Sequence, residues 1–255
     1  MIDTHTHLYA EEFDEDRDEM IQRAIDKGVK KFFLPAIDSA YHEKMIGLEK
    51  AYPGKIFAMI GLHPTYVKPD TWEKELSIVE NYLAEREFCA IGEIGIDLYW
   101  DKSTLDIQVK AFEIQIDWAI ERNLPIVIHT RESFDEVFEV LERKKHPKMR
   151  GIFHCFSGTL EQAKLAVEYG FLLGIGGVVT FKNGKIDQFL HEIPLENIVL
   201  ETDSPYLAPV PYRGKRNESS YLELVAGILV DIYGKSLEEI SVITATNAER
   251  IFQQQ

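Results

Sequence analysis

The sequence predicts an α/β fold, specifically a (β/α)8 TIM barrel, and two observations carry this prediction. Short apolar or β-branched segments that stop at a polar residue recur eight times, and segments with helical spacing of apolar residues follow them. The length of 255 residues suits an α/β barrel that forms one domain. We therefore expect one domain over residues 1–255, with a doubly wound open sheet as the alternative fold.

The expected elements follow one another regularly along the chain. The strands are the short apolar or β-branched segments at residues 1–3, 30–35, 56–61, 89–92, 126–128, 151–153, 171–175 and 198–200. The helices are the segments with helical spacing of apolar residues, at 14–27, 40–51, 71–86, 104–122, 132–145, 159–169, 220–233 and 238–252. The clearest is 104–122, where Phe112, Ile116 and Ala119 recur at steps of four and three. This alternation favours a parallel barrel.

The charge balance limits the partners that the protein binds through its overall field. The chain has 28 Lys and Arg residues against 43 Asp and Glu residues, a formal net charge of −15. This excess of negative charge argues against a protein that coats nucleic acid or an anionic membrane. A local basic site remains compatible with it.

Other features predict a reduced, cytoplasmic protein. The first residues, MIDTHTH, lack the basic and apolar regions of a signal peptide. The longest nearly apolar segment, residues 170–179, is too short and too glycine-rich to cross a bilayer, so we expect no membrane partner. Only Cys89 and Cys155 are present, too few for a disulfide framework.

Ionisable side chains lie at or just beyond the C-terminal ends of the expected strands. In a barrel all of these ends open on one face, so residues from distant parts of the chain converge there. An open sheet would spread them along an edge. The residues concerned are His5, His7, His63, Glu93, His129, His154 and Asp203.

Two of these strand ends indicate a metal site. His5 and His7 are two residues apart, and alternation along a strand places both on one side, where they can bind one ion. Glu93 closes an apolar segment next to a glycine, where an unpaired buried carboxylate would cost several kcal/mol or take up a proton. Its two oxygens can instead bridge two cations.

The remaining strand ends complete the set. His129 and His154 each follow a purely apolar segment, and Asp203 follows the last expected strand. Four imidazoles with one or two carboxylates suit two divalent ions such as Zn²⁺, Mn²⁺ or Mg²⁺. Paired ions can activate a water and stabilise the departing oxygen of a hydrolysed ester. The set therefore predicts a hydrolase with two divalent metal ions.

Several sequence blocks resemble those of the TatD family of metal-dependent hydrolases, within the wider amidohydrolase-like barrels. They are IDTHTHL at 2–8, GLHP at 61–64, GEIGID at 92–97, IHTRE at 128–132, FHCFSG at 153–158, LGIGGVVTFKN at 173–183, ETDSPYLAP at 201–209 and YRGKRNE at 212–218. The resemblance extends over nearly the whole chain. It implies a TIM-barrel hydrolase of the deoxyribonuclease type with a divalent-metal site. Departures include Tyr9, where many relatives have an acidic or amide residue, and Thr65, where a second histidine is common.

The resemblance also implies which residues hold the metals. By analogy, one metal would be bound by His5, His7, Glu93 and Asp203. The second would be bound by Glu93, His129 and His154, with Glu93 as the bridge. Asp203 would orient the attacking water or take its proton, so Asp203 and Glu93 are the expected catalytic residues.

Further residues are candidates for binding a DNA substrate, expected to be a single-stranded or frayed 3′ end. His63 and Arg131 lie just beyond strand ends and are expected to contact phosphate, the alternatives being a helix-capping histidine and a surface ion pair. Arg213 and Lys215 belong to a basic loop, 211–217, that could hold the nucleic-acid backbone. Additional stacking or binding surface is offered by Tyr99, Trp100, Phe181, Lys182 and Lys185. The alternative is that these are ordinary solvated loop residues.

Two other functions fit the same barrel. An amidohydrolase would cleave a C–N or lactone bond in a small molecule with the same ligands, because a fold does not fix its substrate. Glu93 stands where some such barrels bridge their metals with a modified lysine, which favours the TatD-like group. A non-catalytic metal-binding protein would keep the whole set of ligands without the chemistry.

Overall fold

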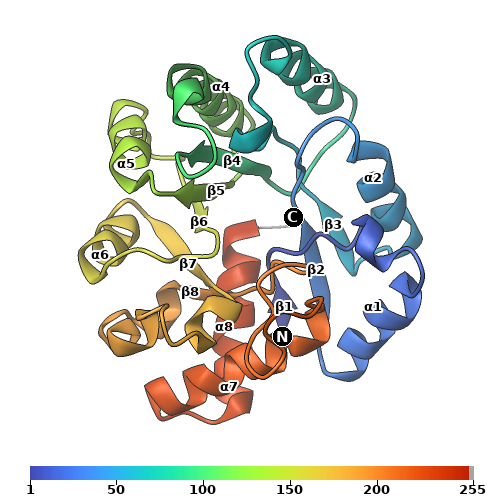
Figure 1. Ribbon diagram of the computed structural model, residues 1–255, viewed down its shortest axis with the longest axis vertical. Coiled ribbons are helices and arrows are strands. Elements are labelled where there is room, and N and C mark those ends of the chain that lie inside the picture. The colour runs from blue at the N-terminus through green and yellow to red at the C-terminus, as the bar shows by residue number, and fades with distance from the viewer. Residues whose placement is uncertain (253–255) are drawn as a thin grey trace.

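The computed structural model describes residues 1–252, which form a TIM barrel with a ring of parallel strands inside a ring of helices (Figure 1). The strands are β1 (Ile2–Asp3), β2 (Lys31–Leu34), β3 (Ile56–Ala58), β4 (Ile91–Asp97), β5 (Ile126–Arg131), β6 (Gly151–Phe153), β7 (Phe171–Ile175) and β8 (Ile198–Leu200). The helices are α1 (Arg17–Asp26), α2 (His42–Ala51), α3 (Trp72–Glu85), α4 (Leu105–Arg122), α5 (Phe134–Arg143), α6 (Leu160–Glu168), α7 (Leu222–Tyr233) and α8 (Leu237–Phe252). None of the helices in residues 1–252 is both long enough and apolar enough to cross a membrane.

Backbone hydrogen bonds close the ring at the two places where the regular ladder is interrupted. The strands pair in parallel in the orders β1-β2-β3 and β4-β5-β6-β7-β8. Between β3 and β4, the Gly92 amide donates to the Ile60 carbonyl at 2.9 Å. Between β8 and β1, the Thr4 amide donates to the Leu200 carbonyl at 3.0 Å. The C-terminal ends of all the strands therefore open on one face, which we call the mouth.

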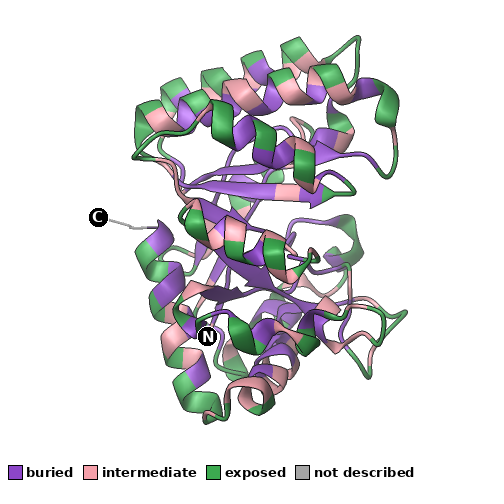
Figure 2. Cartoon of the chain, turned by 90° about the vertical axis from the view of Figure 1, so that its left-hand side faces the viewer, coloured by how far each residue is buried: buried purple, intermediate pink, exposed green. Residues whose placement is uncertain are grey.

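An apolar layer fills the end of the barrel opposite the mouth. Each strand, or the residue beside it, contributes one side chain: Ile2, Phe33, Met59, Ala90, Val127, Ile152, Leu172 and Val199. Helix α8 packs its last residues under this layer, and the Phe252 ring stacks on Phe33 with 3.8 Å between centroids. Figure 2 shows the strands buried and the helices exposed on their outer faces. Because this end is closed by apolar packing, the buried polar side chains of the strands gather at the mouth.

Two strands are longer than the sequence predicted. Strand β4 continues to Asp97 and β5 to Arg131, whereas we expected their ends at residues 92 and 128. The expected boundaries were wrong because a polar residue was taken to end each strand. Glu93 and His129 instead lie inside their strands, where each finds polar partners. The register between β4 and β5 shifts around Glu93, which therefore occupies an irregular position in the ladder.

The connection between β7 and β8 also differs from the prediction of a helical segment after every strand. Between Gly177 and Asn197 the described chain forms only four short 3₁₀ turns and no α-helix. Gly184 and Pro194 lie within this connection, and both residue types disfavour a continuous α-helix.

A buried histidine outside the cluster of candidate metal ligands makes stability depend on pH. His42 begins α2 and is 1% exposed, and neither of its ring nitrogens has a hydrogen-bond partner among the described residues. Burial lowers its pKa from 6.5 to about 4. Since the unfolded chain binds the proton first, the native state loses stability as the pH falls from 6.5 to about 4.

We expect a His42→Leu variant to lose less stability on acidification than the wild type, by about 3 kcal/mol across this interval. The measurement is the free energy of unfolding from urea titrations at pH 7 and pH 4.5. A His191→Leu variant is the control, because His191 is exposed. Equal acid sensitivity of the wild type and the His42 variant would refute the prediction.

Candidate metal centre

The structure brings the predicted histidines and carboxylates together at the mouth. His5 and His7 follow β1, His63 follows β3, Glu93 lies in β4, His129 lies in β5, His154 follows β6, and Asp203 follows β8. All are buried except His63 and His129, which are partly exposed. The site is thus assembled from six strands and is closed to bulk water on all sides but the mouth.

The carboxylate of Glu93 lies at the centre of the cluster. Its Oε2 is 3.1 Å from Nε2 of His5. Its Oε1 is 2.8 Å from Nδ1 of His129, 3.3 Å from Nε2 of His63 and 3.7 Å from Nε2 of His154. The two oxygens therefore face different histidines, which is the arrangement that a bridging carboxylate requires.

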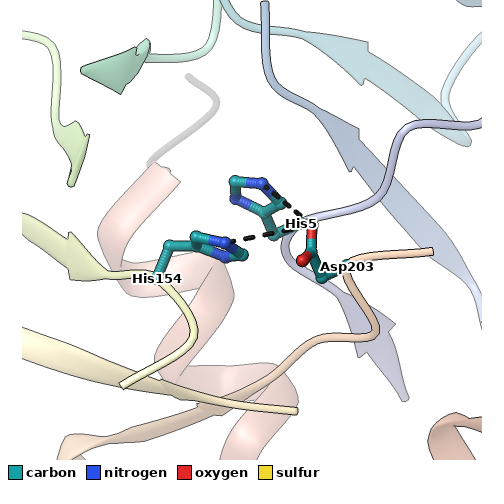
Figure 3. A group of neighbouring side chains, drawn as sticks. All are labelled: His5, His154 and Asp203. Carbon is teal, nitrogen blue, oxygen red and sulfur yellow. Dashed lines mark ion pairs between the residues drawn. The ribbon is translucent and has the colours of Figure 1, made fainter. Parts of the chain in front are cut away.

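Asp203 forms a second focus of the cluster. Its Oδ1 lies 3.3 Å from Nε2 of His7, 3.8 Å from Nε2 of His5 and 3.9 Å from Nε2 of His154. Figure 3 shows His5 and His154 beside this carboxylate. The two imidazole rings are stacked, with 3.4 Å between their centroids. Asp203 has a φ of +56°, a left-handed conformation that few residues other than glycine adopt and that is frequent at functional sites.

The residues fit a divalent metal. His5 is fully buried, and neither of its ring nitrogens has a hydrogen-bond partner among residues 1–252, a costly state that a cation at Nε2 would relieve. Potential ligand atoms lie within 4.8 Å of one another in four overlapping groups: His5, His154 and Asp203; His5, His7 and Glu93; His63, Glu93 and His129; and His154, Cys155 and Glu201. Imidazole and carboxylate donors of this kind suit Zn²⁺ or Mn²⁺.

The electrostatics keep the two central carboxylates ionised. Burial by itself would raise the pKa of Glu93, but neighbouring charges, chiefly His63 and His5, outweigh it and hold the pKa well below its usual value. Burial likewise acts to raise the pKa of Asp203, and His154 above all holds that pKa below its usual value. Both groups are therefore anionic at neutral pH and can bind a cation.

Two carboxylates that the sequence analysis did not single out orient the histidines. Asp97 Oδ2 is 2.8 Å from Nε2 of His129, and Glu201 Oε1 is 2.9 Å from Nδ1 of His154. Each leaves the other ring nitrogen facing Glu93, as carboxylates behind histidine ligands do in metal sites. Burial acts to lower the pKa of His154, but Glu201 is the main charge that outweighs burial and raises the pKa to about 10. The available signal was that both acids lie in the predicted motifs, beside Glu93 and Asp203.

The glycine at position 174 leaves room for the Glu201 side chain. A Cβ atom built on Gly174 would lie 2.2 Å from Oε2 of Glu201, so only glycine leaves room for this carboxylate. Glu201 is 0% exposed and also accepts the Cys155 amide at 2.7 Å. The glycine in β7 is therefore part of the support for His154.

Tyr9 and Thr65 set the tautomers of two histidines. The Tyr9 hydroxyl donates to the Pro35 carbonyl at 2.6 Å, so it must accept from Nδ1 of His7 at 2.8 Å, and this leaves a lone pair on Nε2 towards Asp203. At His63 the roles are reversed, because the Thr65 amide donates to Nδ1 at 3.2 Å. His63 therefore carries its proton on Nε2 and presents a donor to the site. It also caps a 3₁₀ turn at residues 64–66, as the alternative interpretation held.

Comparison with known proteins identifies the family of this chain. The family model described as TatD related DNase matches residues 2–253. The chain belongs to the TatD family of metal-dependent hydrolases. The uncharacterized metal-dependent hydrolase YabD of Bacillus subtilis is 40% identical, over 99% of this chain and 98% of its own. YcfH of Escherichia coli K12, of the same description, is 30% identical, over 99% of this chain and 95% of its own. The structure of the TatD homolog YjjV from E. coli K12 matches with a TM-score of 0.93 and 28% identity, covering 100% of this chain and 98% of that one.

The cations predicted to bind substrate lie at the mouth of this TatD barrel. Arg131 is the last residue of β5, and Arg213 and Lys215 belong to the loop after β8. The Arg131 guanidinium stacks on the Tyr99 ring at 3.7 Å and forms no ion pair with a described residue, so the alternative of a surface ion pair does not hold. Arg213 stacks on Phe181 at 3.6 Å, and Lys215 lies 5.9 Å from the Tyr212 ring.

Arg216, the third cation of the basic loop, forms an ion pair with a carboxylate outside the loop. Arg216 donates to Asp16 at 2.6 and 2.8 Å, and this ion pair joins the loop to the start of α1. Arg213 and Lys215 are therefore the cations of this loop that stay candidates for binding substrate, because the charge of Arg216 is balanced by a carboxylate.

We expect Asp97→Asn and Glu201→Gln each to weaken divalent metal binding in this TatD protein by about 10- to 100-fold, because each removes a carboxylate that orients a histidine. Calorimetric titration of the metal-free protein with Mn²⁺ measures the affinity. Asp106→Asn, on the exposed first turn of α4, is the matched control. Unchanged Mn²⁺ affinity in both variants would show that the two carboxylates do not support the site.

Proposed function

We propose that this TatD-family protein hydrolyses phosphodiester bonds in DNA, with two divalent ions bound at the mouth. The observation that carries the proposal is the position of Glu93, whose Oε2 faces His5 while its Oε1 faces His129 and His63. One carboxylate between two groups of histidines is the donor arrangement that a pair of metals needs. The family description as DNases supports DNA as the substrate.

The proposed ligand sets divide the cluster between the two ions. His5, His7 and Asp203 would hold the first, and His129 and His154 the second, with Glu93 shared. Bound divalent ions would supply a water nucleophile at neutral pH and neutralise charge on the phosphate oxygens. The donors are already directed inwards, because Tyr9 fixes the tautomer of His7.

Asp203 is the proposed general base. Its carboxylate is ionised, and its side chain is 12% exposed whereas that of Glu93 is 3% exposed, so Asp203 lies nearer to the entering substrate. It would accept the proton of the attacking water. Glu93 is surrounded by imidazoles, and its proposed role is to hold the two ions in place between the histidine ligands.

His63 is proposed to contact the phosphate. Its Nε2–H points into the site while Thr65 occupies Nδ1, so the ring can donate to a non-bridging phosphate oxygen. Arg131 would bind a phosphate of the same strand, since its charge is not balanced by any carboxylate of residues 1–252. A centre whose carboxylates are almost completely buried suits a strand end, and we propose exonucleolytic cleavage of a single-stranded or frayed 3′ end.

The test of the proposal is the Glu93→Gln variant. We expect it to lose at least about 100-fold in cleavage of a 3′ single-stranded oligonucleotide and to retain less metal, because an amide cannot bridge two cations. Metal content is measured by mass spectrometry, and Glu85→Gln at the exposed end of α3 is the control. Near-normal metal content and cleavage in Glu93→Gln would overturn the proposal. Wild-type hydrolysis of amides or lactones in place of DNA would assign the site to the amidohydrolase alternative.

The basic loop gives an independent prediction about salt. Arg213→Ala and Lys215→Ala should each weaken DNA binding and reduce the slope of log affinity against log salt concentration by about 1. The measurement is fluorescence anisotropy of a labelled single strand between 50 and 200 mM salt, an interval of ~4-fold. Lys110→Ala, on the exposed face of α4, should leave the slope unchanged. A wild-type slope in the Arg213 and Lys215 variants would remove this loop from the DNA-binding surface.

A further inference from the structure

The exposed aromatic side chains of the described chain gather at the mouth. Among residues 1–252, the large aromatic side chains that are exposed to solvent are Tyr66 (39% exposed), Tyr99 (49%), Trp100 (70%) and Tyr206 (46%). We call these four the mouth aromatics. They lie on the loops after β3, β4 and β8, and the β4 loop carries two of them. Aromatic surface left in water at one place indicates a binding role.

Two of the mouth aromatics stand directly beside histidines of the metal centre. The ring of Tyr206 lies 5.7 Å from that of His7, and the ring of Tyr66 lies 6.3 Å from that of His63, both edge-on. A molecule whose reacting group lies at the metal centre therefore meets aromatic rings on more than one side.

Trp100 is the most exposed of the four, and its loop is fastened to the metal centre through one carboxylate. The amides of Tyr99 and Trp100 donate to Asp97 Oδ1 at 3.0 and 3.1 Å. The other oxygen of Asp97 lies 2.8 Å from Nε2 of His129. The position of the Trp100 backbone is thus fixed relative to a proposed metal ligand, with a single side chain between them.

Arg131 completes this surface. Its guanidinium covers the Tyr99 ring at 3.7 Å and lies 5.6 Å from the Trp100 ring, which stands perpendicular to Tyr99 at 88°. One face of Tyr99 is therefore occupied, whereas the indole of Trp100 remains open to solvent. A phosphate bound by Arg131 and a flat group stacked on Trp100 would be close enough to belong to one strand.

We propose that Trp100 is a stacking platform for an unpaired nucleobase of the substrate, positioned by Asp97 and flanked by the phosphate-binding Arg131. This inference rests on the proposed function and specifies how the same site selects its substrate. Stacking on Trp100 needs an uncovered base face. In a duplex the neighbouring base pairs cover these faces and pairing holds each base in the stack, so the platform selects single-stranded ends over duplex. Because every base has such a face, selection is for unpaired bases and tolerates any sequence.

The experiment compares Trp100→Ala with the wild type on two single-stranded oligonucleotides, one natural and one with abasic sites at its last nucleotides. On the natural strand we expect KM to rise by about 10-fold, within the ~5- to 100-fold range of one base stack, with little change in kcat. On the abasic strand the rise in KM should be below about twofold, because there is no base to stack. Trp100→Phe should recover most of the KM, and Leu237→Ala, an exposed apolar residue at the start of α8, is the matched control.

Equal changes in KM on both strands, or none on either, would overturn the platform. Metal content of Trp100→Ala must equal that of the wild type, since a loss would mean that the variant acts through Asp97 and His129 and would also overturn it.

A binding measurement separates this proposal from the hydrolase proposal. Quenching of Trp100 fluorescence by the natural but not the abasic strand, with Trp100→Phe as the blank, supports the platform even if the wild type cleaves neither strand. If the wild type cleaves the strands but the natural and abasic strands quench Trp100 equally, the stacking proposal is wrong and the hydrolase proposal stands. A fluorescence shift with anionic phospholipid vesicles and none with the oligonucleotide would assign the mouth aromatics to a membrane surface instead.

Discussion

The buried carboxylate of Glu93 is the interaction on which the rest of this site depends. It lies inside β4, where an isolated charge would be strongly destabilising, and imidazoles on two sides keep it ionised. The local shift in register between β4 and β5 places it there. Every histidine of the cluster is oriented with respect to its two oxygens or to Asp203.

The polar residues behind the histidines decide what each ring offers to the site. Tyr9 leaves His7 with a lone pair on Nε2, whereas Thr65 leaves His63 with a proton there. Asp97 forms a hydrogen bond with His129, and Glu201 lies at ion-pair distance from His154. The residue bonded to Nδ1 therefore decides the role of the ring. It leaves His7 with a lone pair for a metal, and it leaves His63 with an N–H that can donate to the substrate.

The net charge of −15 is compatible with a nucleic-acid substrate because the charges are unevenly distributed. Acidic residues occupy the first turns of several helices of the outer ring, where most of them are exposed to solvent and lie outside the buried centre of the barrel. At the mouth the central carboxylates face imidazoles. Arg131 and Arg213 stack on aromatic rings, Lys215 lies near one, and none of the three has a carboxylate partner among the described residues. The overall field thus opposes nonspecific coating, while the local field at the mouth favours one strand.

The sequence by itself determined the barrel and the convergence of histidines and acids at one end of it, because apolar strands followed by histidines or acids are local patterns. It placed His5, His129 and His154 at one face, where the structure has them. Only the tertiary structure decided the tautomer of His63, the carboxylate behind each histidine and the loss of Arg216 to Asp16. These depend on contacts between strands or loops, and no spacing along the chain encodes the distance between two ring atoms. The true length of β4 was likewise settled by the partners that Glu93 finds across the barrel.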